Sequence, residues 1–173
     1  MKGAKKVSEI MDDIFDFPHL PYWFSVRQAT DILKRTLPAD NVCNYPRSIL
    51  IFDERYNLLG SLNIRDILRG IEPQLQVPLV ESDHPFEDDS VLASIAEGLY
   101  GDASVGLLDK PVSDFMTPAR FFLSPDDPVT KAAYLMIHYN IISLPVLESR
   151  KKLIGMVRMV RVFDEIATAL LAD

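Results

Sequence analysis

Two short segments with the same layout carry opposite charges at matching positions. LLGSLNIRDIL holds Asn63 and Asp66, whereas LIGMVRMVRVF holds Arg158 and Arg161. A carboxylate accepts hydrogen bonds, while a guanidinium only donates them and can bind phosphate in a bidentate manner. One segment therefore offers an acceptor, and the other offers donors suited to an anion.

These segments close two copies of a longer repeat. Residues 46–68 align without a gap on residues 141–163, and each copy predicts an apolar strand, a polar turn and a second strand. Upstream, VRQATDILK from Val26 parallels VTKAAYLMI from Val129, with apolar residues on one helical face. VSEIM and VSDFM stand at the front of the copies. Each copy thus predicts short helix, strand, helix, strand, strand, helix.

The connection between the copies runs from Gly70 to Lys110. An acidic run ends at Asp89, and a helix is expected from about Ser90 to Tyr100, with the acids at its positive N-terminus. So long a connection is unusual inside a compact domain. We expect a helical insertion that packs on the surface.

This duplicated unit resembles the CBS domain pair, also called a Bateman module. SLPVL before a second strand and GSLNIRD before a last helix carry the resemblance. Family repeats have a glycine, then Thr or Ser three residues on, then Asp three residues later. The first repeat supplies Gly60, Asn63 and Asp66, whereas the second supplies Gly155 and then two arginines.

The resemblance implies an α/β (α+β) fold of tandem CBS repeats, each α-β-α-β-β-α, packed with pseudo-twofold symmetry. The repeats are expected at 4–70 and 111–173, with the helical insertion at 71–110. It further implies a regulatory, energy-sensing module that binds AMP, ADP, ATP or S-adenosylmethionine between the repeats. No cofactor is required beyond this regulatory ligand.

Carried over by position, the acid of the first repeat would accept the ribose hydroxyls, because charge-assisted hydrogen bonds are the stronger kind. The expected ligand-binding residues, with the adenine wall from the second repeat, are Asn63, Arg65, Asp66, Arg120, Phe121, Ile142, Ser143 and Pro145. The expected phosphate-binding residues are Arg158 and Arg161.

Both charged positions have a structural alternative. Asp66 beside Asn63 also fits a first-turn acid of a capped helix. The two arginines of the second repeat cannot accept from ribose hydroxyls, and they could instead pair with Asp164 or Glu165. The acid-to-base change therefore predicts one working cleft and one altered cleft.

Composition narrows the function class. The chain has 173 residues, 48% of them hydrophobic and 25% charged, with a net charge of −7. The acidic balance argues against nucleic acid, and no apolar run approaches the roughly 20 residues of a membrane helix. Cys43 stands alone, so a cytoplasmic location is expected. HPFEDD from His84 could chelate a metal, but an acidic loop before a helix is the simpler interpretation, and no metal site is predicted.

No nucleophile and base can be paired in the sequence, so an enzyme is not expected. The leading hypothesis is a stand-alone ligand sensor that signals by conformational change or by binding a separate effector protein. The alternative is a CBS-type dimerisation or docking scaffold that has lost nucleotide binding. A homodimer is expected through the last helix, FDEIATALLAD, and the first, VSEIMDDIF.

Overall fold

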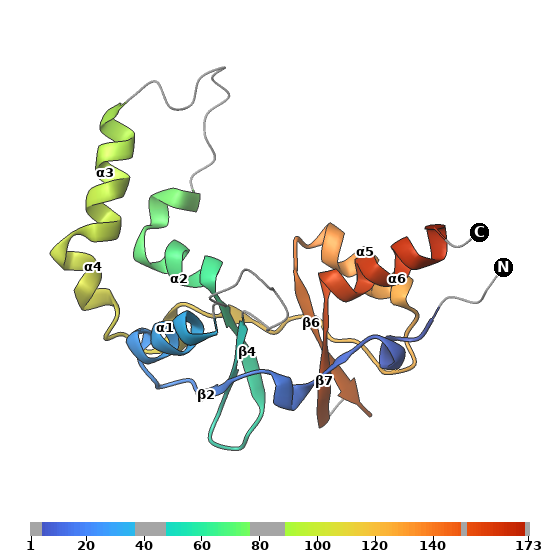
Figure 1. The fold of residues 1–173 in the computed structure, drawn as a ribbon. Helices are drawn as coiled ribbons and strands as arrows, with labels where there is room; N and C mark the ends of the chain where they lie inside the picture. The colour runs from blue at the N-terminus through green and yellow to red at the C-terminus, as the bar shows by residue number, and fades with distance from the viewer. Residues whose placement is uncertain (1–4, 37–47, 77–88, 150–151, 172–173) are drawn as a thin grey trace. The chain divides into compact units, whose positions relative to one another are not determined.

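The computed structural model describes residues 5–36, 48–76, 89–149 and 152–171 (Figure 1). Within these ranges the chain is mixed α/β with two separate sheets, which confirms the predicted fold class and the repeated order of elements. No helix in these ranges is long and apolar enough to cross a membrane. Cys43, His84 and the acidic residues 87–88 lie outside the described residues.

By packing, the chain divides into two compact units. Unit 1 comprises residues 1–17 and 119–173, and unit 2 comprises residues 18–118. The repeats expected at 4–70 and 111–173 divide the chain by sequence, and they remain a prediction. The packing units differ from them because the leading segment of each repeat lies with the sheet of the other repeat.

Unit 2 holds a four-stranded sheet in the order β2-β3-β4-β5, with β2 parallel to β3 and the other pairs antiparallel. Its elements in chain order are β2 (His19–Pro21), α1 (Val26–Arg35), β3 (Ser48–Phe52), β4 (Leu58–Asn63), α2 (Ile64–Ile71), the 3₁₀-helix η3 (Pro73–Gln76), α3 (Asp89–Tyr100), α4 (Asp102–Leu107), the 3₁₀-helix η4 (Val112–Asp114) and β5 (Thr117–Pro118). The helix predicted at 90–100 is α3.

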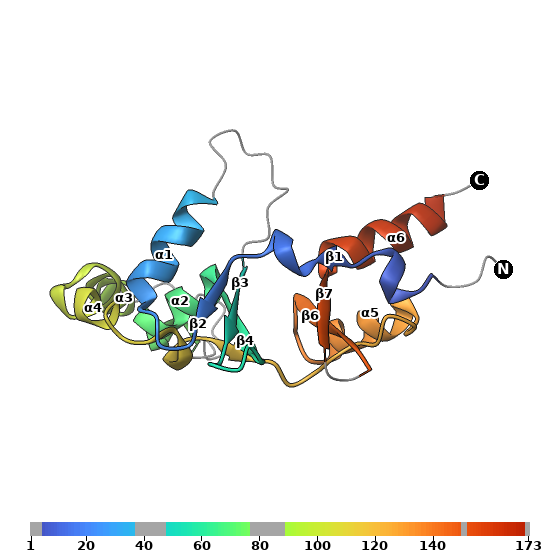
Figure 2. The same cartoon turned by 90° about the horizontal axis from the view of Figure 1, so that it is seen from below.

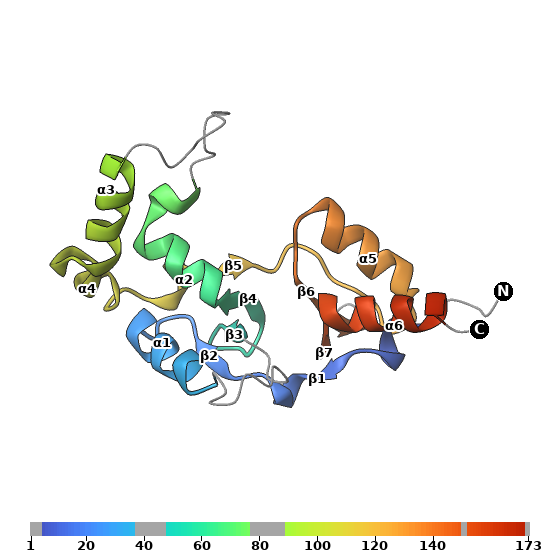
Figure 3. The same ribbon diagram turned by 45° about the horizontal axis from the view of Figure 1, so that its top comes forward.

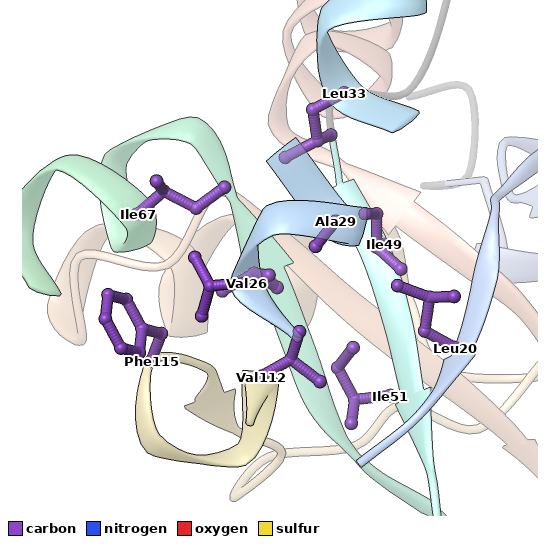
Figure 4. Packing of buried hydrophobic residues seen from close by; sticks show 10 residues of the cluster. Leu20, Val26, Ala29, Leu33, Ile49, Ile51, Ile67, Val112 and Phe115 are labelled. Atoms are coloured by element: carbon purple, nitrogen blue, oxygen red, sulfur yellow. The ribbon is translucent and has the colours of Figure 1, made fainter. Parts of the chain in front are cut away.

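The core of unit 2 forms where α1 and η4 cover the sheet (Figure 4). Val26, Ala29 and Leu33 recur at helical spacing on α1, and all three are buried. Ser25 caps this helix: its hydroxyl accepts from the backbone N–H of Gln28 at 3.3 Å. The cap and the apolar face together fix α1 on the sheet.

Unit 1 holds a three-stranded antiparallel sheet in the order β1-β7-β6. Its elements in chain order are the 3₁₀-helix η1 (Val7–Glu9), β1 (Asp12–Asp13), the 3₁₀-helix η2 (Ile14–Asp16), α5 (Val129–His138), β6 (Ser143–Glu148), β7 (Lys152–Arg158) and α6 (Met159–Leu171). Leu123 forms a parallel bridge with Val146, the counterpart of the β2–β3 pairing in unit 2. Its core joins Val7 from the front of the chain to residues of α5, β6, β7 and α6.

Each sheet is completed by a segment from far away in the sequence. Strand β1 pairs with β7 in unit 1, and β5 pairs with β4 in unit 2 (Figures 2 and 3). The glycines shared by the repeats lie at these contacts. A Cβ on Gly60 would stand 2.4 Å from the carbonyl oxygen of Thr117, and one on Gly155 would stand 2.7 Å from that of Asp12. The repeated glycine is therefore needed because another backbone passes against it.

Substitution of either glycine tests this close approach. Gly60→Ala and Gly155→Ala should each lower the free energy of unfolding by about 1–3 kcal/mol, because a backbone oxygen cannot move aside cheaply. Gly106→Ala on α4 is the control, since nothing lies within 4 Å of its added Cβ. It should leave stability unchanged or raise it by up to about 1 kcal/mol through better helix propensity. Urea denaturation measures all three, and equal effects at the three positions would contradict the explanation.

Candidate functional site

In unit 2, the end of β4 and the start of α2 form a reciprocal helix cap. The side-chain oxygen Oδ1 of Asn63 accepts from the backbone N–H of Asp66 at 3.0 Å. Oδ2 of Asp66 in turn accepts from the backbone N–H of Asn63, also at 3.0 Å. The interpretation of Asp66 as a first-turn acid of a capped helix is thus confirmed, whereas its role toward a ligand remains a prediction.

Two further donors reach the other carboxylate oxygen of Asp66. Its Oδ1 accepts from Nη2 of Arg69 at 2.8 Å and from the hydroxyl of Thr117 on β5 at 2.8 Å. We call Asn63, Asp66, Arg69 and Thr117 the α2 junction. Asp66 is only 2% exposed, and an ionised carboxylate has about four acceptor positions. Three donors already bind it, so the Asp66 carboxylate has about one acceptor position left.

Unit 1 has a corresponding cluster at the start of α6, formed by Asp12, Arg158 and Arg161, which we call the α6 junction. Oδ2 of Asp12 accepts from Nε of Arg158 at 2.5 Å. Oδ1 of Asp12 accepts from Nε of Arg161 at 2.9 Å, and Nη2 of Arg161 lies 2.8 Å from the same oxygen. Here the acid belongs to the incoming strand β1, and the donors belong to β7 and α6.

The α6 junction contains a strongly paired buried acid. Asp12 is 6% exposed, and burial alone would raise the pKa of its carboxyl. Hydrogen bonds from Arg158 and Arg161, together with their positive charges, outweigh burial and lower this pKa below its ordinary value. Asp12 is therefore ionised at neutral pH and holds both guanidiniums.

The alternative interpretation of Arg158 and Arg161 correctly expected an ion pair, but it named the wrong acids, Asp164 and Glu165. Both arginines bind Asp12, and Glu165 instead pairs with Lys5. Both arginines bind Asp12 because β1 pairs with β7 and so places a buried carboxylate beside them, whereas Asp164 lies exposed on α6. The arginines are thus already occupied by an internal anion.

The remaining predicted residues fall in both units. Arg65 lies exposed on α2 in unit 2, whereas the expected adenine wall belongs to unit 1. There, Phe121 stacks on Tyr139 with ring centroids 4.1 Å apart. Of the other members of that wall, Arg120 is exposed and Ser143 lies opposite Arg158 in the sheet. The carbonyl of Ile142 accepts from the backbone N–H of Met159 at 2.8 Å, and the carbonyl of Pro145 accepts from that of Leu123 at 2.9 Å.

Sequence reasoning missed Asp12, Thr117 and Arg69. The first two follow the methionine in VSEIM and VSDFM, so they are the next matched positions of the repeat. Extending that alignment by one residue would have paired an acid with a hydroxyl. Arg69 stands three residues after Asp66, a spacing at which helical side chains meet. In the described ranges, no group of three or more His, Cys, Asp or Glu residues could hold a metal ion.

Comparison with known proteins gives one family-model match, to part of the chain, and one shared fold. The family model described as CBS domain matches residues 112–168. The CBS-pair protein CBSX2 from Arabidopsis thaliana is 18% identical, with 99% of this chain and 100% of that chain covered and a TM-score of 0.61.

Two similar structures contain ligands. CBSX2 in complex with AMP is 19% identical, covering 95% of this chain and 98% of that chain with a TM-score of 0.62. The CBS domain pair of MJ0100, in complex with 5′-methylthioadenosine and S-adenosylmethionine, is 18% identical, covering 96% and 99% with a TM-score of 0.60. Among curated proteins, no sequence similar to this chain was found.

Acid should weaken unit 1 through Asp12. Because its native pKa lies below the ordinary value of 3.8, its contribution to stability is complete above that value and is lost as the pH falls through the native pKa. Asp12→Asn should lower the free energy of unfolding at pH 7 by about 1–3 kcal/mol and should reduce its decline toward about pH 3.

The measurement is urea denaturation of both proteins across this pH range. Asp126→Asn is the matched control, because Asp126 is exposed and pairs with Lys6 at the surface. Such a pair contributes little, so the control should follow the wild type. If Asp12→Asn declined as steeply with acid as the wild type, the assignment of this pH dependence to Asp12 would be wrong.

Proposed function

Because the CBS domain family model matches residues 112–168 and the chain has the fold of a CBS domain pair, we propose that this protein is a regulatory module that binds an adenosine-containing ligand. AMP, 5′-methylthioadenosine and S-adenosylmethionine are bound by the two similar proteins described above. All three contain adenosine. The proposed ligands are AMP, ADP, ATP or S-adenosylmethionine, and the bound state signals by conformational change or partner binding.

The observation that carries this proposal is the buried carboxylate of Asp66 at the N-terminus of α2. A ribose diol brings two hydroxyl donors, while one acceptor position of the carboxylate remains after its three present donors. At least one donor must therefore leave. Arg69 and Thr117 are the candidates, because both have access to water and need not become buried without a partner.

The rest of the ligand is assigned by chemistry. Phe121 and Ile142 offer accessible apolar surface to an adenine base, whereas Pro145 is buried in β6 and can only support that surface from behind. Ser143 and Asn63 can donate and accept hydrogen bonds. The exposed guanidiniums of Arg65 and Arg120 suit a phosphate. The arginines of the α6 junction are already bound to Asp12, so we propose one ligand per chain.

Binding should be measured by calorimetry with AMP, ADP, ATP and S-adenosylmethionine in turn. The wild type should bind at least one of them at one equivalent per chain. Asp66→Asn keeps the side-chain shape but removes the charged acceptor, so affinity for that ligand should fall about tenfold or more.

Asp126→Asn is again the control, because it removes an exposed carboxylate of unit 1 and should leave affinity unchanged. Circular dichroism at the titration temperature verifies that each variant is folded. Ligand should also raise the melting temperature of the wild type. If none of the four compounds bound to the wild type, or if Asp66→Asn bound with unchanged affinity, the proposed sensing role would be excluded.

A second candidate function is a homodimerisation scaffold, and the exposed apolar residues of unit 1 favour it. Helices α5 and α6 contact each other and carry large apolar side chains toward solvent. These residues, which we call the α5/α6 patch, are Tyr134, Ile137, Val160, Phe163, Ile166, Leu170 and Leu171. These residues lie on two helices that contact each other, and large exposed apolar patches commonly mark interaction sites. The other helix expected to contribute, VSEIMDDIF, is instead η1, β1 and η2.

Sedimentation velocity tests this candidate. If the α5/α6 patch joins two copies, the wild type should sediment as a dimer, and Phe163→Glu should shift it to monomer because a charge would be buried at the contact. Tyr100→Glu on α3 is the matched control: Tyr100 is 88% exposed and Phe163 is 69% exposed, but Tyr100 lies in unit 2. A monomeric wild type, or a dimer that survives Phe163→Glu, would rule out this interface.

A further inference from the structure

The two junctions are built at equivalent places but with reversed polarity. In the α2 junction the acid, Asp66, is on the helix and the donor, Thr117, is on the incoming strand. In the α6 junction the donor, Arg161, is on the helix and the acid, Asp12, is on the incoming strand. The helix positions are equivalent in the repeat alignment, and the strand positions both follow the shared methionine.

The two incoming segments are otherwise alike. VSEIMD and VSDFMT share valine, serine and methionine at the same positions. Each begins with a short 3₁₀-helix, η1 or η4, and each buries its valine completely, Val7 in the core of unit 1 and Val112 in the core of unit 2. Each also ends in a two-residue strand that lies against a glycine of the receiving strand. Backbone pairing and the burial of the shared valine therefore do not distinguish the two segments, although the Phe115 ring, at the place of Ile10, also packs against Gly70 in unit 2.

The charged junctions do distinguish them. If the segments traded places, the carboxylate of Asp12 would face that of Asp66, which is 2% exposed. Two carboxylates at one buried position cannot both stay ionised without a large cost. In the other unit, Thr117 would leave Arg158 and Arg161 with a neutral hydroxyl in place of a carboxylate. Both halves of the wrong pairing are thus penalised.

We propose that the reversed polarity of the two junctions is a pairing code, which directs residues 5–17 to the sheet of unit 1 and residues 111–118 to the sheet of unit 2. The acid in one copy and the base in the other are then two halves of one device. Asp12, Arg161, Asp66 and Thr117 are its positioning residues. The code concerns the folded chain without ligand and does not depend on the proposed nucleotide binding.

The first test exchanges the code. Asp12→Thr, Thr117→Asp and the variant carrying both are compared with the wild type by thermal unfolding without nucleotide. Asp12→Thr should lower the midpoint by about 6 °C or more, because it leaves guanidiniums without their carboxylate. Thr117→Asp should lower it as well, through repulsion by Asp66. The doubly exchanged variant should be the least stable while its segments keep their places, and trading of the segments would raise its midpoint again because both junctions would then match.

The second test restores the pair with opposite polarity inside unit 1. In Asp12→Thr with Arg161→Asp, the new hydroxyl can donate to the new carboxylate as Thr117 does to Asp66, and Arg158 stays as a second donor. This variant should recover at least half of the midpoint lost in Asp12→Thr. If Asp12→Thr alone does not fold, the proposal is still tested, because the variant with both Asp12→Thr and Arg161→Asp is expected to fold.

Lys6→Ala is the control for an ion pair on the same segment. Lys6 and Asp126 are both exposed, so the midpoint should change by no more than about 2 °C. An Asp12→Thr variant as stable as Lys6→Ala, or a restored pair no more stable than Asp12→Thr, would overturn the pairing code. Because no nucleotide is present, neither result bears on whether a ligand binds.

Discussion

The structure depends on the close approach of a distant backbone to the third strand of each repeat. At Gly60 and Gly155 no side chain fits, because the carbonyl oxygen of Thr117 or Asp12 already occupies the space where a Cβ would lie. The receiving strand, the two-residue incoming strand and the following helix are fixed at that contact. The positions of the junction residues follow from it.

The same contact ties the proposed ligand chemistry to folding. A carboxylate placed on the helix can keep an acceptor position for an incoming hydroxyl, as Asp66 does beside Arg69 and Thr117. A carboxylate placed on the incoming strand is consumed by two arginines, as Asp12 is. The placement of the acid, on the helix as Asp66 or on the incoming strand as Asp12, thus decides both which strand docks and which repeat retains an acceptor.

Local structure could be predicted from the sequence because its causes are local. The hairpin strands at 49–52 and 144–147, the cap at Ser25 and the helix at 90–100 each follow from periodicity or capping chemistry, and all are present. The exchange of leading segments could not be predicted, because β1 and β5 have two residues each and show no alternation. The partner of Arg158 and Arg161 depended on that exchange, so Asp12 was overlooked.

The exchange also limits how the chain can be divided. A cut in the connection between the repeats would leave each sheet without the edge strand that covers it, because β1 would travel with one piece and β7 with the other. The freed edges of β4 and β7 would present unpaired amide and carbonyl groups, which are templates for aggregation. Isolated repeats would therefore be poorer folding units than the intact pair, even though each has its own hydrophobic core.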